Sequence, residues 1–263
     1  MRSYDSDLSD SILFELTDAG VAVITINRPE RRNAIDRATA QAISDALDRV
    51  DADEVVRVAV ITGAGGTFSA GMDLKALNAS GERPIVDGRG QFGICRRPPL
   101  KPLIAAVEGH ALGGGTEIAL ASDMIIAAED ATFGLPEVKL GLAAAAGGAI
   151  RLPRRIPYGL ALEYILTGRS IPARRAHELG LVNRLSEPGE ALREALSLAE
   201  EIAANAPLGV RLSKQMMIET QDVSMAEAFE LQEPLIQIIR SSEDAAEGAR
   251  AFVEKRPPVW KGR

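Results

Sequence analysis

Three consecutive glycines, which join an apolar run to a helical pattern, constrain this chain more than any other stretch. Residues 102–107 are apolar or small and predict a short buried strand, and residues 118–121 predict the body of a helix. Gly113, Gly114 and Gly115 lie between them. The first turn of a helix has unpaired N–H groups and the positive end of the helix dipole, and glycine lets a ligand approach those groups closely. This turn is therefore expected to stabilise an anion through its backbone.

Glu117 adds a carboxylate to the same turn. It lies three residues after Gly114, so its side chain can point to the same face of the helix. A carboxylate beside N–H donors suits a reaction in which negative charge develops on a carbonyl oxygen while a proton moves nearby. The triplet alone is equally typical of close packing between a strand and a helix, with Glu117 as a surface acid that matches the dipole. The rest of the chain decides between these interpretations.

The composition excludes several classes of protein. The 263 residues are 46% hydrophobic and suffice for one large domain, and a net charge of −7 argues against a nucleic-acid partner while leaving room for a few cations aimed at a phosphorylated ligand. One cysteine, Cys95, and two histidines argue against a disulfide within the chain and against a metal site. No apolar run reaches the roughly 18–20 residues that span a bilayer. Residues 1–7 lack the apolar core of a signal peptide, so we expect a cytoplasmic protein with no membrane partner.

Periodicity predicts an α/β body that is followed by a helical tail. The predicted strands are 12–17, 21–26, 55–61, 102–107, 123–128 and 181–185, the first two forming a hairpin. The predicted helices are 37–51, 157–167, 172–179 and 189–205, with another that follows Gly147 and Gly148.

Three further segments have weaker or different patterns. Pro29 is expected to keep residues 27–33 out of a helix. Residues 76–101 predict a mobile loop with a short helix near 91–97, which is either a lid or a plain surface connection. Beyond Pro207, residues 208–253 are helical with joints near 220–224 and 241–243, and their apolar face must pack on the body or on another subunit.

A second glycine-rich junction follows the predicted strand at 55–61. It is not a dinucleotide fingerprint, because Phe68 stands where the third glycine is needed. It is also not a Walker A loop, since no Gly-Lys-Ser/Thr follows. Ser69 is not in a nucleophile elbow, because Thr67 occupies the first glycine position.

Three segments, taken together and in order, resemble the crotonase (enoyl-CoA hydratase/isomerase) superfamily. They are 68–75 (FSAGMDLK), 109–117 (GHALGGGTE) and 133–137 (FGLPE). The resemblance extends from 27–29 to 251–256 and so covers nearly the whole chain. It implies an α/β fold with a ββα spiral core, in which helices flank two roughly perpendicular sheets. The core would comprise residues 1–205 and a C-terminal helical trimerisation region residues 206–263, giving a homotrimer or a dimer of trimers.

The resemblance also implies an acyl-CoA thioester substrate, with no cofactor beyond the CoA that the substrate carries. The thioester oxygen is expected between the backbone N–H groups of Met72 and Gly114. Glu117 and Glu137 correspond to two glutamates that flank a water molecule in the family's hydratases. Adding water to a double bond conjugated to a thioester needs a base for the water and an acid for Cα, and the negative charge passes through an enolate-like oxygen.

Other residues correspond to positions that bind CoA and substrate in the family, the last two of them supplied by a neighbouring subunit. They are Arg31, Arg32, Ala70, Asp73, Leu74, Lys75, Gly113, Phe252 and Lys255. Asp73 is interpreted as ordering the oxyanion loop rather than transferring protons. Cys95 is interpreted as a buried, inert thiol and His110 as a packing residue.

The resemblance implies an enoyl-CoA hydratase, and two related enzymes remain as alternatives. A carnitinyl-CoA dehydratase is one, because 136–141 and the C-terminal segments 243–248 and 255–263 look especially similar to that group. An enoyl-CoA isomerase is the other, although both glutamates are present and Ala143–Ala146 occupy the place where dienoyl isomerases have an aspartate. These alanines also replace the Ile-Pro-Gly-Ala of common hydratases, which puts the acyl-chain preference in question. The non-enzyme alternatives are an acyl-CoA-binding homologue with little catalysis and an interaction scaffold that uses the helical tail.

Overall fold

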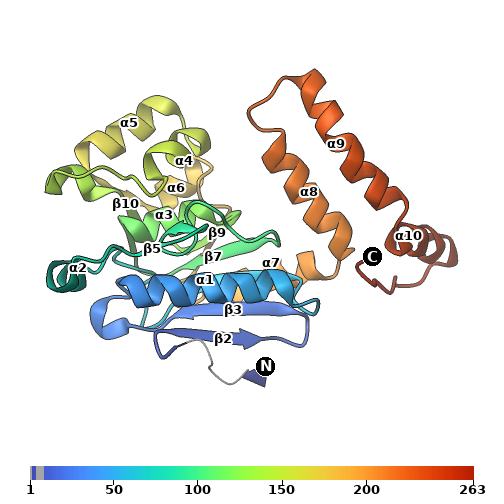
Figure 1. Ribbon diagram of the computed structural model, residues 1–263, viewed down its shortest axis with the longest axis horizontal. Coiled ribbons are helices and arrows are strands. Elements are labelled where there is room, and N and C mark those ends of the chain that lie inside the picture. Colours follow the sequence, from blue (N-terminus) through green and yellow to red (C-terminus); the bar gives the residue numbers. More distant parts are fainter. Residues whose placement is uncertain (1, 4–8) are drawn as a thin grey trace.

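The computed structural model describes residues 2–3 and 9–263, which form an α/β body and a helical tail (Figure 1). We predicted that residues 1–7 are not a signal peptide. Of these residues, Arg2 and Ser3 belong to the described part of the chain and the others lie outside it. Within the described residues, the main sheet has the order β1-β2-β3-β4-β7-β9-β12, and its neighbours are parallel from β3 onward. Its strands are Arg2–Ser3 (β1), Ile12–Leu16 (β2), Val21–Ile26 (β3), Val58–Gly63 (β4), Leu103–Val107 (β7), Met124–Ala128 (β9) and Arg184–Ser186 (β12).

The six predicted strands are present, with shifted boundaries at two of them. β2 and β3 pair antiparallel, which confirms the hairpin. β4 begins at Val58 instead of 55, because the Asp53 side chain accepts the N–H of Val55 at 2.9 Å and keeps it in a turn. β12 begins at Arg184 instead of 181, since the preceding residues close helix α6 (Ala173–Glu178) through hydrogen bonds to the carbonyl of Ala176.

Two predicted helices cover opposite faces of the main sheet (Figure 1). Successive residues of a strand point to opposite faces, and the core divides accordingly. Helix α1 (Arg37–Ala52) packs on the face that includes Ile61, and the Asp36 side chain caps it by accepting the N–H of Thr39. Helix α7 (Ala191–Ala203) packs on the face that includes Val60.

A second, smaller sheet places the glycine triplet. It has the order β11-β10-β8, and its three-residue strands were too short to be predicted from alternation. They are His110–Leu112 (β8), Thr132–Gly134 (β10) and Ser170–Pro172 (β11). β8 leads directly into helix α3 (Gly114–Ala121), so the helix begins at the middle glycine. The described helices that follow are Gly148–Arg155 (α4), Tyr158–Thr167 (α5) and α6, as expected.

The expectations for residues 27–33 and 76–101 were wrong in part. Pro29–Arg31 forms a single 3₁₀ turn (η1), which a proline at its start permits because the first N–H needs no partner. The segment 76–101 begins inside helix α2 (Leu74–Ser80) and continues through the strand pair Ile85–Val86 (β5) and Gly90–Gln91 (β6).

The short helix expected near 91–97 is absent. Phe92 and Gly93 both have a left-handed backbone, with φ of 58° and 71°, which a right-handed helix cannot include. Phe92, Ile94 and Cys95 are buried in the main core, so this stretch is not a plain surface connection.

The helical tail projects from the body (Figure 1). It consists of Pro207–Glu219 (α8), Met225–Arg240 (α9) and Glu243–Glu254 (α10), which confirms both predicted joints. The Lys214 ammonium attaches α8 to the body by donating to the carbonyls of Pro99 and Lys101 and to Asp123. Several large apolar side chains of the tail remain exposed, namely Met217, Ile218, Met225, Phe229, Leu231, Ile238, Phe252 and Val253. No helix within residues 2–3 and 9–263 has the length and apolar character needed to cross a membrane.

Candidate active site

The two glycine-rich junctions lie against each other. Ser69 and Ala111 form a parallel bridge, and the Leu112 N–H donates to the Ser69 carbonyl at 2.9 Å. A Cβ atom built on Gly71 would lie 2.7 Å from the Gly114 nitrogen, so only glycine permits this approach. Gly71 also has φ of 84°, which disfavours other residues. The resemblance implied one oxyanion site with a donor from each glycine-rich junction, and the fold brings the two junctions into contact.

The backbone N–H groups of Met72 and Gly114 both lie at this junction. The neighbouring groups are engaged, because Ile35 donates to the carbonyl of Gly71 at 2.7 Å and accepts from the N–H of Asp73 at 2.9 Å. Gly114 is the first residue of α3, where an N–H has no partner within the helix. Among the described residues, neither Met72 nor Gly114 donates its N–H to an acceptor. Two free donors beside each other are the arrangement that an oxyanion requires.

Glu117 is buried beside these donors, in the first turn of α3. Its Oε1 accepts the N–H of Gly148, the first residue of α4, at 2.9 Å. The pKa of Glu117 is raised to about 7, chiefly by burial and also by the nearby charge of Glu137, although the Gly148 N–H and the Arg151 guanidinium act to lower it. The interpretation of Glu117 as a surface acid is therefore wrong, because its side chain is only 3% exposed.

Glu137 approaches the same point from another segment. It lies in the 3₁₀ turn Pro136–Leu140 (η2), directly after β10. A Cβ built on Gly113 would lie 3.3 Å from Oε1 of Glu137, so this carboxyl group reaches the glycine turn. Burial raises the pKa of Glu137, and within the described residues its Oε2 is buried without a hydrogen-bond partner. An unpartnered buried carboxyl oxygen points to a ligand or water that the site accommodates.

Hydrogen bonds hold the segment that carries Glu137 against the glycine turn. Gly113 donates its N–H to the carbonyl of Gly134 at 2.8 Å. The hydroxyl of Thr116 accepts from Gly134 N–H at 3.0 Å and donates to the carbonyl of Ala111 at 2.6 Å. This buried hydroxyl thus connects β8, α3 and β10. Helix α3 carries Glu117, and the turn that follows β10 carries Glu137.

Asp73, which follows Met72, is engaged in structural contacts. Its carboxylate caps α2 by accepting the N–H of Ala76 at 3.0 Å and forms ion pairs with Arg28 at 3.1 Å and Arg31 at 3.3 Å. These partners lower the pKa of Asp73 although burial opposes them, so the group stays ionised. Arg28, which sequence reasoning did not single out, is the more buried of the two cations.

The structure brings most of the predicted CoA-binding residues to one edge of the site. Ala70 is exposed and donates its N–H to the carbonyl of Arg32 at 2.9 Å, which joins the two segments. Leu74 and Lys75 are exposed in the first turn of α2. The Arg31 side chain is half exposed beside Asp73.

Phe252 and Lys255 lie away from this edge. Both are exposed near the end of α10, at the opposite side of the molecule from α2 (Figure 1). Within one chain the structure therefore does not bring them to the other CoA-binding positions.

The alanine run that replaces the usual hydratase loop is partly buried. Ala144 and Ala146 belong to the main core, and Ala143 and Ala145 are exposed. A Cβ on Gly148 would meet Ala144 and Leu135 at about 3 Å, so the run packs directly behind the N–H that contacts Glu117. Cys95 lies nearby, and burial raises the pKa of its thiol, which agrees with an inert cysteine.

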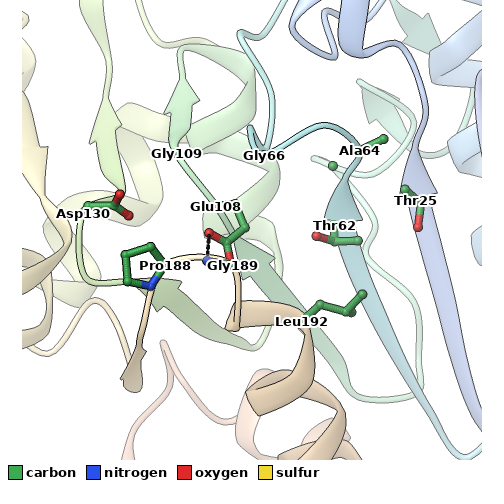
Figure 2. A pocket seen from close by; sticks show the side chains of 11 residues that line it. Thr25, Thr62, Ala64, Gly66, Glu108, Gly109, Asp130, Pro188, Gly189 and Leu192 are labelled. Carbon is green, nitrogen blue, oxygen red and sulfur yellow. Dashed lines mark hydrogen bonds between the residues drawn. The ribbon is translucent and has the colours of Figure 1, made fainter.

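A separate cavity of about 500 Å³ lies at the carboxyl ends of β3, β4 and β7 (Figure 2). Neither Glu117 nor Glu137 lines it. Glu108 lines this cavity. Its carboxylate accepts the N–H groups of Gly189 at 3.0 Å and Ala191 at 2.8 Å, and these contacts fix the beginning of α7. This acid is therefore engaged in structure.

Sequence reasoning missed three residues of the candidate site. The Gly148 N–H, the Arg28 guanidinium and the Phe92 ring all reach it through contacts between segments distant in sequence. The sequence did contain a weak indication for Phe92. It lies between Gly90 and Gly93, and an aromatic residue between two turn-forming glycines is consistent with a side chain that is buried in the core.

Comparisons with known proteins agree with this geometry. Residues 16–263 match the family described as enoyl-CoA hydratase/isomerase. An enoyl-CoA hydratase from Mycobacterium tuberculosis is 43% identical over 92% of this chain and 93% of its own length. A carnitinyl-CoA dehydratase from Proteus mirabilis is 43% identical over 94% and 97%. The crystal structure of an enoyl-CoA hydratase from Mycobacterium tuberculosis H37Rv superposes with a TM-score of 0.94 at 52% identity, over 97% of this chain and 100% of that one.

Proposed function

Because the chain belongs to the enoyl-CoA hydratase/isomerase family, the crotonase superfamily, we propose that it is a hydro-lyase that reversibly adds water to a 2-enoyl-CoA thioester. The observation that carries this proposal is the meeting of two free backbone donors with the carboxyl groups of the buried Glu117 and the half-buried Glu137. An isomerase needs only one carboxyl group to move a proton, whereas hydration needs a base and an acid together.

In the proposed reaction, the thioester oxygen accepts the N–H groups of Met72 and Gly114. One carboxylate removes a proton from water, whose oxygen forms the new bond to C3, and the electrons of the double bond move onto the thioester oxygen. The other glutamate then donates its proton to C2. The pair thus needs one proton in total, and the raised pKa values of Glu117 and Glu137 favour such a singly protonated pair.

The binding of CoA is proposed from position. Arg31, Arg32 and Lys75 are exposed cations on the segments that adjoin the glycine junction, and they would bind the CoA phosphates. Ala70, Asp73, Leu74 and Gly113 form the adjacent backbone edge. No cofactor is required beyond the CoA of the substrate.

Assembly would complete the CoA site. Phe252 is 85% exposed on the tail, together with the other uncovered apolar residues there. We therefore assign residues 206–263 to oligomerisation and residues 1–205 to the core, and Phe252 and Lys255 then reach the CoA of a neighbouring subunit. A homotrimer or a dimer of trimers fits this proposal.

A carnitinyl-CoA dehydratase is the second candidate. Relatives with that name are 43–44% identical to this chain, close to the 43% of one enoyl-CoA hydratase from Mycobacterium tuberculosis but below the 52% of the hydratase whose crystal structure was compared. The alanine run beside Gly148 also differs from the loop of common hydratases. Both enzymes would use the same glutamates, so the two candidates differ in acyl group and not in chemistry.

The test follows the enoyl-thioester absorbance of crotonyl-CoA with the wild-type protein, Glu117→Gln and Glu137→Gln. For the two-carboxylate hydratase, we expect the wild-type protein to remove the absorbance band. We expect the rate of its loss to be about 10²–10⁴-fold lower in either variant. A parallel assay with crotonobetainyl-CoA distinguishes the candidates, and turnover of that substrate alone supports the dehydratase. Acyl-CoA binding with no turnover of either substrate would contradict the proposal and support a binding protein.

A further inference from the structure

Phe92 lies directly against the glycine that supplies one of the two donors. A Cβ built on Gly114 would be 2.3 Å from Cζ of the Phe92 ring and 2.5 Å from Cε2. The ring is only 2% exposed and belongs to the main core. Its edge therefore occupies the space behind Gly114, where any other residue at position 114 would place its side chain.

The backbone at Phe92 is held in a conformation that phenylalanine rarely adopts. Its φ of 58° is left-handed, and for a bulky residue this persists only where the surroundings impose it. The Phe92 N–H donates to the carbonyl of Pro84 at 2.7 Å. The next residue, Gly93, lies so close to α1 that a Cβ would be 2.0 Å from the carbonyl of Ala40.

A buried arginine anchors the same segment to α1. Arg89 is 1% exposed, and its guanidinium donates to Asp48, Asp51 and the carbonyl of Arg97. On the other side, Arg151 of α4 donates to the carbonyl of Cys95 at 2.7 Å. Residues 84–97 are thus fixed between α1 and the helices of the candidate site, with the Phe92 ring pressed onto Gly114.

We propose that Phe92 is a positioning residue, which sets the Gly114 N–H at the place where the oxyanion of the substrate forms. The inference rests on the proposed function, since it concerns the same oxyanion site. The ring touches Gly114 and not the reacting atoms, so it acts through the donor. Misplacing a catalytic group by about 1 Å can cost roughly 10²-fold in rate, so a small shift of Gly114 has a measurable effect.

The contact predicts a rescue that is specific for one glycine. Gly114 does not have a left-handed backbone, so alanine is compatible with its conformation, and the Phe92 ring is the nearest obstacle. At Gly115 the obstacle is the backbone carbonyl of Ser69, at 2.2 Å from a built Cβ. Removing the ring should therefore restore activity to Gly114→Ala but not to Gly115→Ala.

The experiment measures kcat and KM for Phe92→Leu, Gly114→Ala, Gly115→Ala and each glycine variant combined with Phe92→Ala. Phe14→Leu, at another buried core phenylalanine in β2, is the matched control for lost packing. We expect Phe92→Leu to lower kcat by about 10- to 100-fold with KM changed less than about threefold. We expect Phe92→Ala to raise the kcat of Gly114→Ala about tenfold or more and to leave Gly115→Ala unimproved.

A spectroscopic readout separates positioning from stability. The thioester carbonyl stretch of crotonyl-CoA, or of crotonobetainyl-CoA if wild type turns over only that substrate, is recorded on Glu117→Gln with and without Phe92→Leu. A smaller downward shift with Phe92→Leu supports the inference. If Phe92→Leu lowers only the melting temperature, as Phe14→Leu does, or if both glycine variants respond alike, the inference is overturned. A wild-type protein that turns over neither substrate would instead overturn the proposed function.

Discussion

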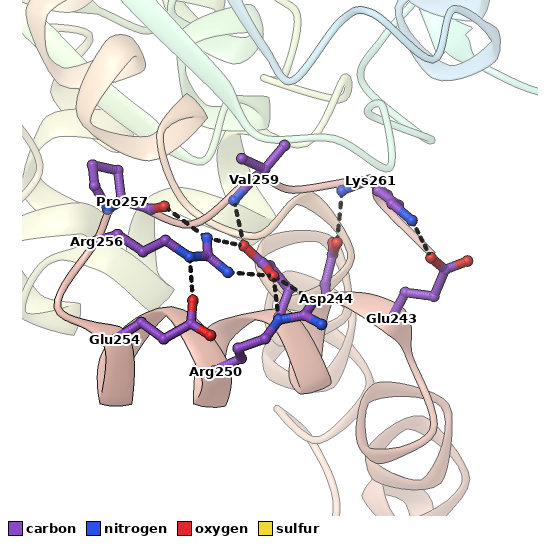
Figure 3. Close-up of polar contacts among 9 residues, drawn as sticks. Glu243, Asp244, Arg250, Glu254, Arg256, Pro257, Val259 and Lys261 are labelled. Atoms are coloured by element: carbon purple, nitrogen blue, oxygen red, sulfur yellow. Dashed lines mark hydrogen bonds and ion pairs between the residues drawn. The ribbon is translucent and has the colours of Figure 1, made fainter.

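The two regions assigned to the CoA site are built in opposite ways. The glycine junction is formed by backbone against backbone at Gly71 and Gly115 and by the Phe92 ring against Gly114, and none of these glycines leaves room for a side chain. The end of the tail is instead held by charged side chains (Figure 3). There the Glu247 carboxylate accepts from Arg250, Arg256 and the N–H of Val259.

The difference follows from what each region has to do. An oxyanion requires donors fixed to a fraction of an ångström, and close backbone packing supplies that rigidity. In the proposed assembly, the tail presents Phe252 and Lys255 to a neighbouring subunit. Its own core is small, with Leu208, Leu212 and Leu235 as its buried apolar residues. A network of charge-assisted hydrogen bonds orders the segment 256–261 against α10 in the absence of a large core.

The largest effect is expected from a single methyl group at Gly71. Gly71→Ala would place Cβ 2.7 Å from the Gly114 nitrogen and the Leu112 carbonyl, and the two junctions would have to separate. We expect kcat/KM to fall by at least about 10²–10³-fold, the cost typical of losing one oxyanion donor. Gly81→Ala is the matched control, because Gly81 has a similar φ of 74° but nothing within 4 Å of a built Cβ. Equal loss of activity in both variants would mean that left-handed strain, and not the contact with Gly114, explains the effect.

The raised pKa of Glu117 predicts a dependence on pH in both activity and stability. The singly protonated pair loses its proton as the pH rises through about 7, so kcat/KM should fall above that pH. The folded protein holds this proton more tightly than the unfolded chain does, because the pKa of Glu117 in the unfolded chain is near 4.5. That stability is complete below about pH 4.5 and is lost as the pH rises through about 7, by an amount on the order of 3 kcal/mol.

Glu117→Gln removes this titration and so provides the test for stability. Denaturant unfolding of wild type and Glu117→Gln is measured between pH 5 and pH 8, which spans much of that range. We expect wild type to lose stability relative to the variant as the pH rises. A constant difference across this range would show that Glu117 titrates normally in the folded protein.

A smaller effect is expected from the charged network of the tail. Hydrogen bonds from Arg256 and Arg250 hold the pKa of Glu247 well below its usual range, so the group is ionised at any working pH. Glu247→Gln should loosen residues 256–261. If the tail binds CoA as proposed and takes no part in the chemistry, KM for the enoyl-CoA should rise about tenfold with kcat nearly unchanged. Glu254→Gln is the control, since Glu254 is half exposed and contacts Arg256 alone. A fall in kcat at constant KM would place the network in the catalytic step instead.

The sequence predicted the secondary structure around the glycine junctions well because those signals are local. The strand that precedes each junction and the start of α3 follow from apolar runs and neighbouring glycines, whereas Glu137 was assigned only from the resemblance. The contacts that complete the site do not follow from local patterns. Phe92 reaches Gly114 through a left-handed turn, and Glu117 meets the N–H of Gly148 across 31 residues. Such contacts depend on how separate segments pack, and periodicity carries no information on that.

The smallest effect is expected where a charge pair lies on the surface of the body. Arg169 and Glu163 are 3.2 Å apart, with side chains 68% and 49% exposed. Solvent screens such a pair, so Glu163→Gln should change the free energy of unfolding by less than about 0.5 kcal/mol and leave kcat and KM unchanged. Denaturant unfolding at low and high salt checks this. Unfolding is also measured for Glu247→Gln. If Glu163→Gln lowers the free energy of unfolding as much as Glu247→Gln does, exposure does not distinguish the surface pair of the body from the network of the tail. The contrast between the two regions would then rest on glycine packing alone.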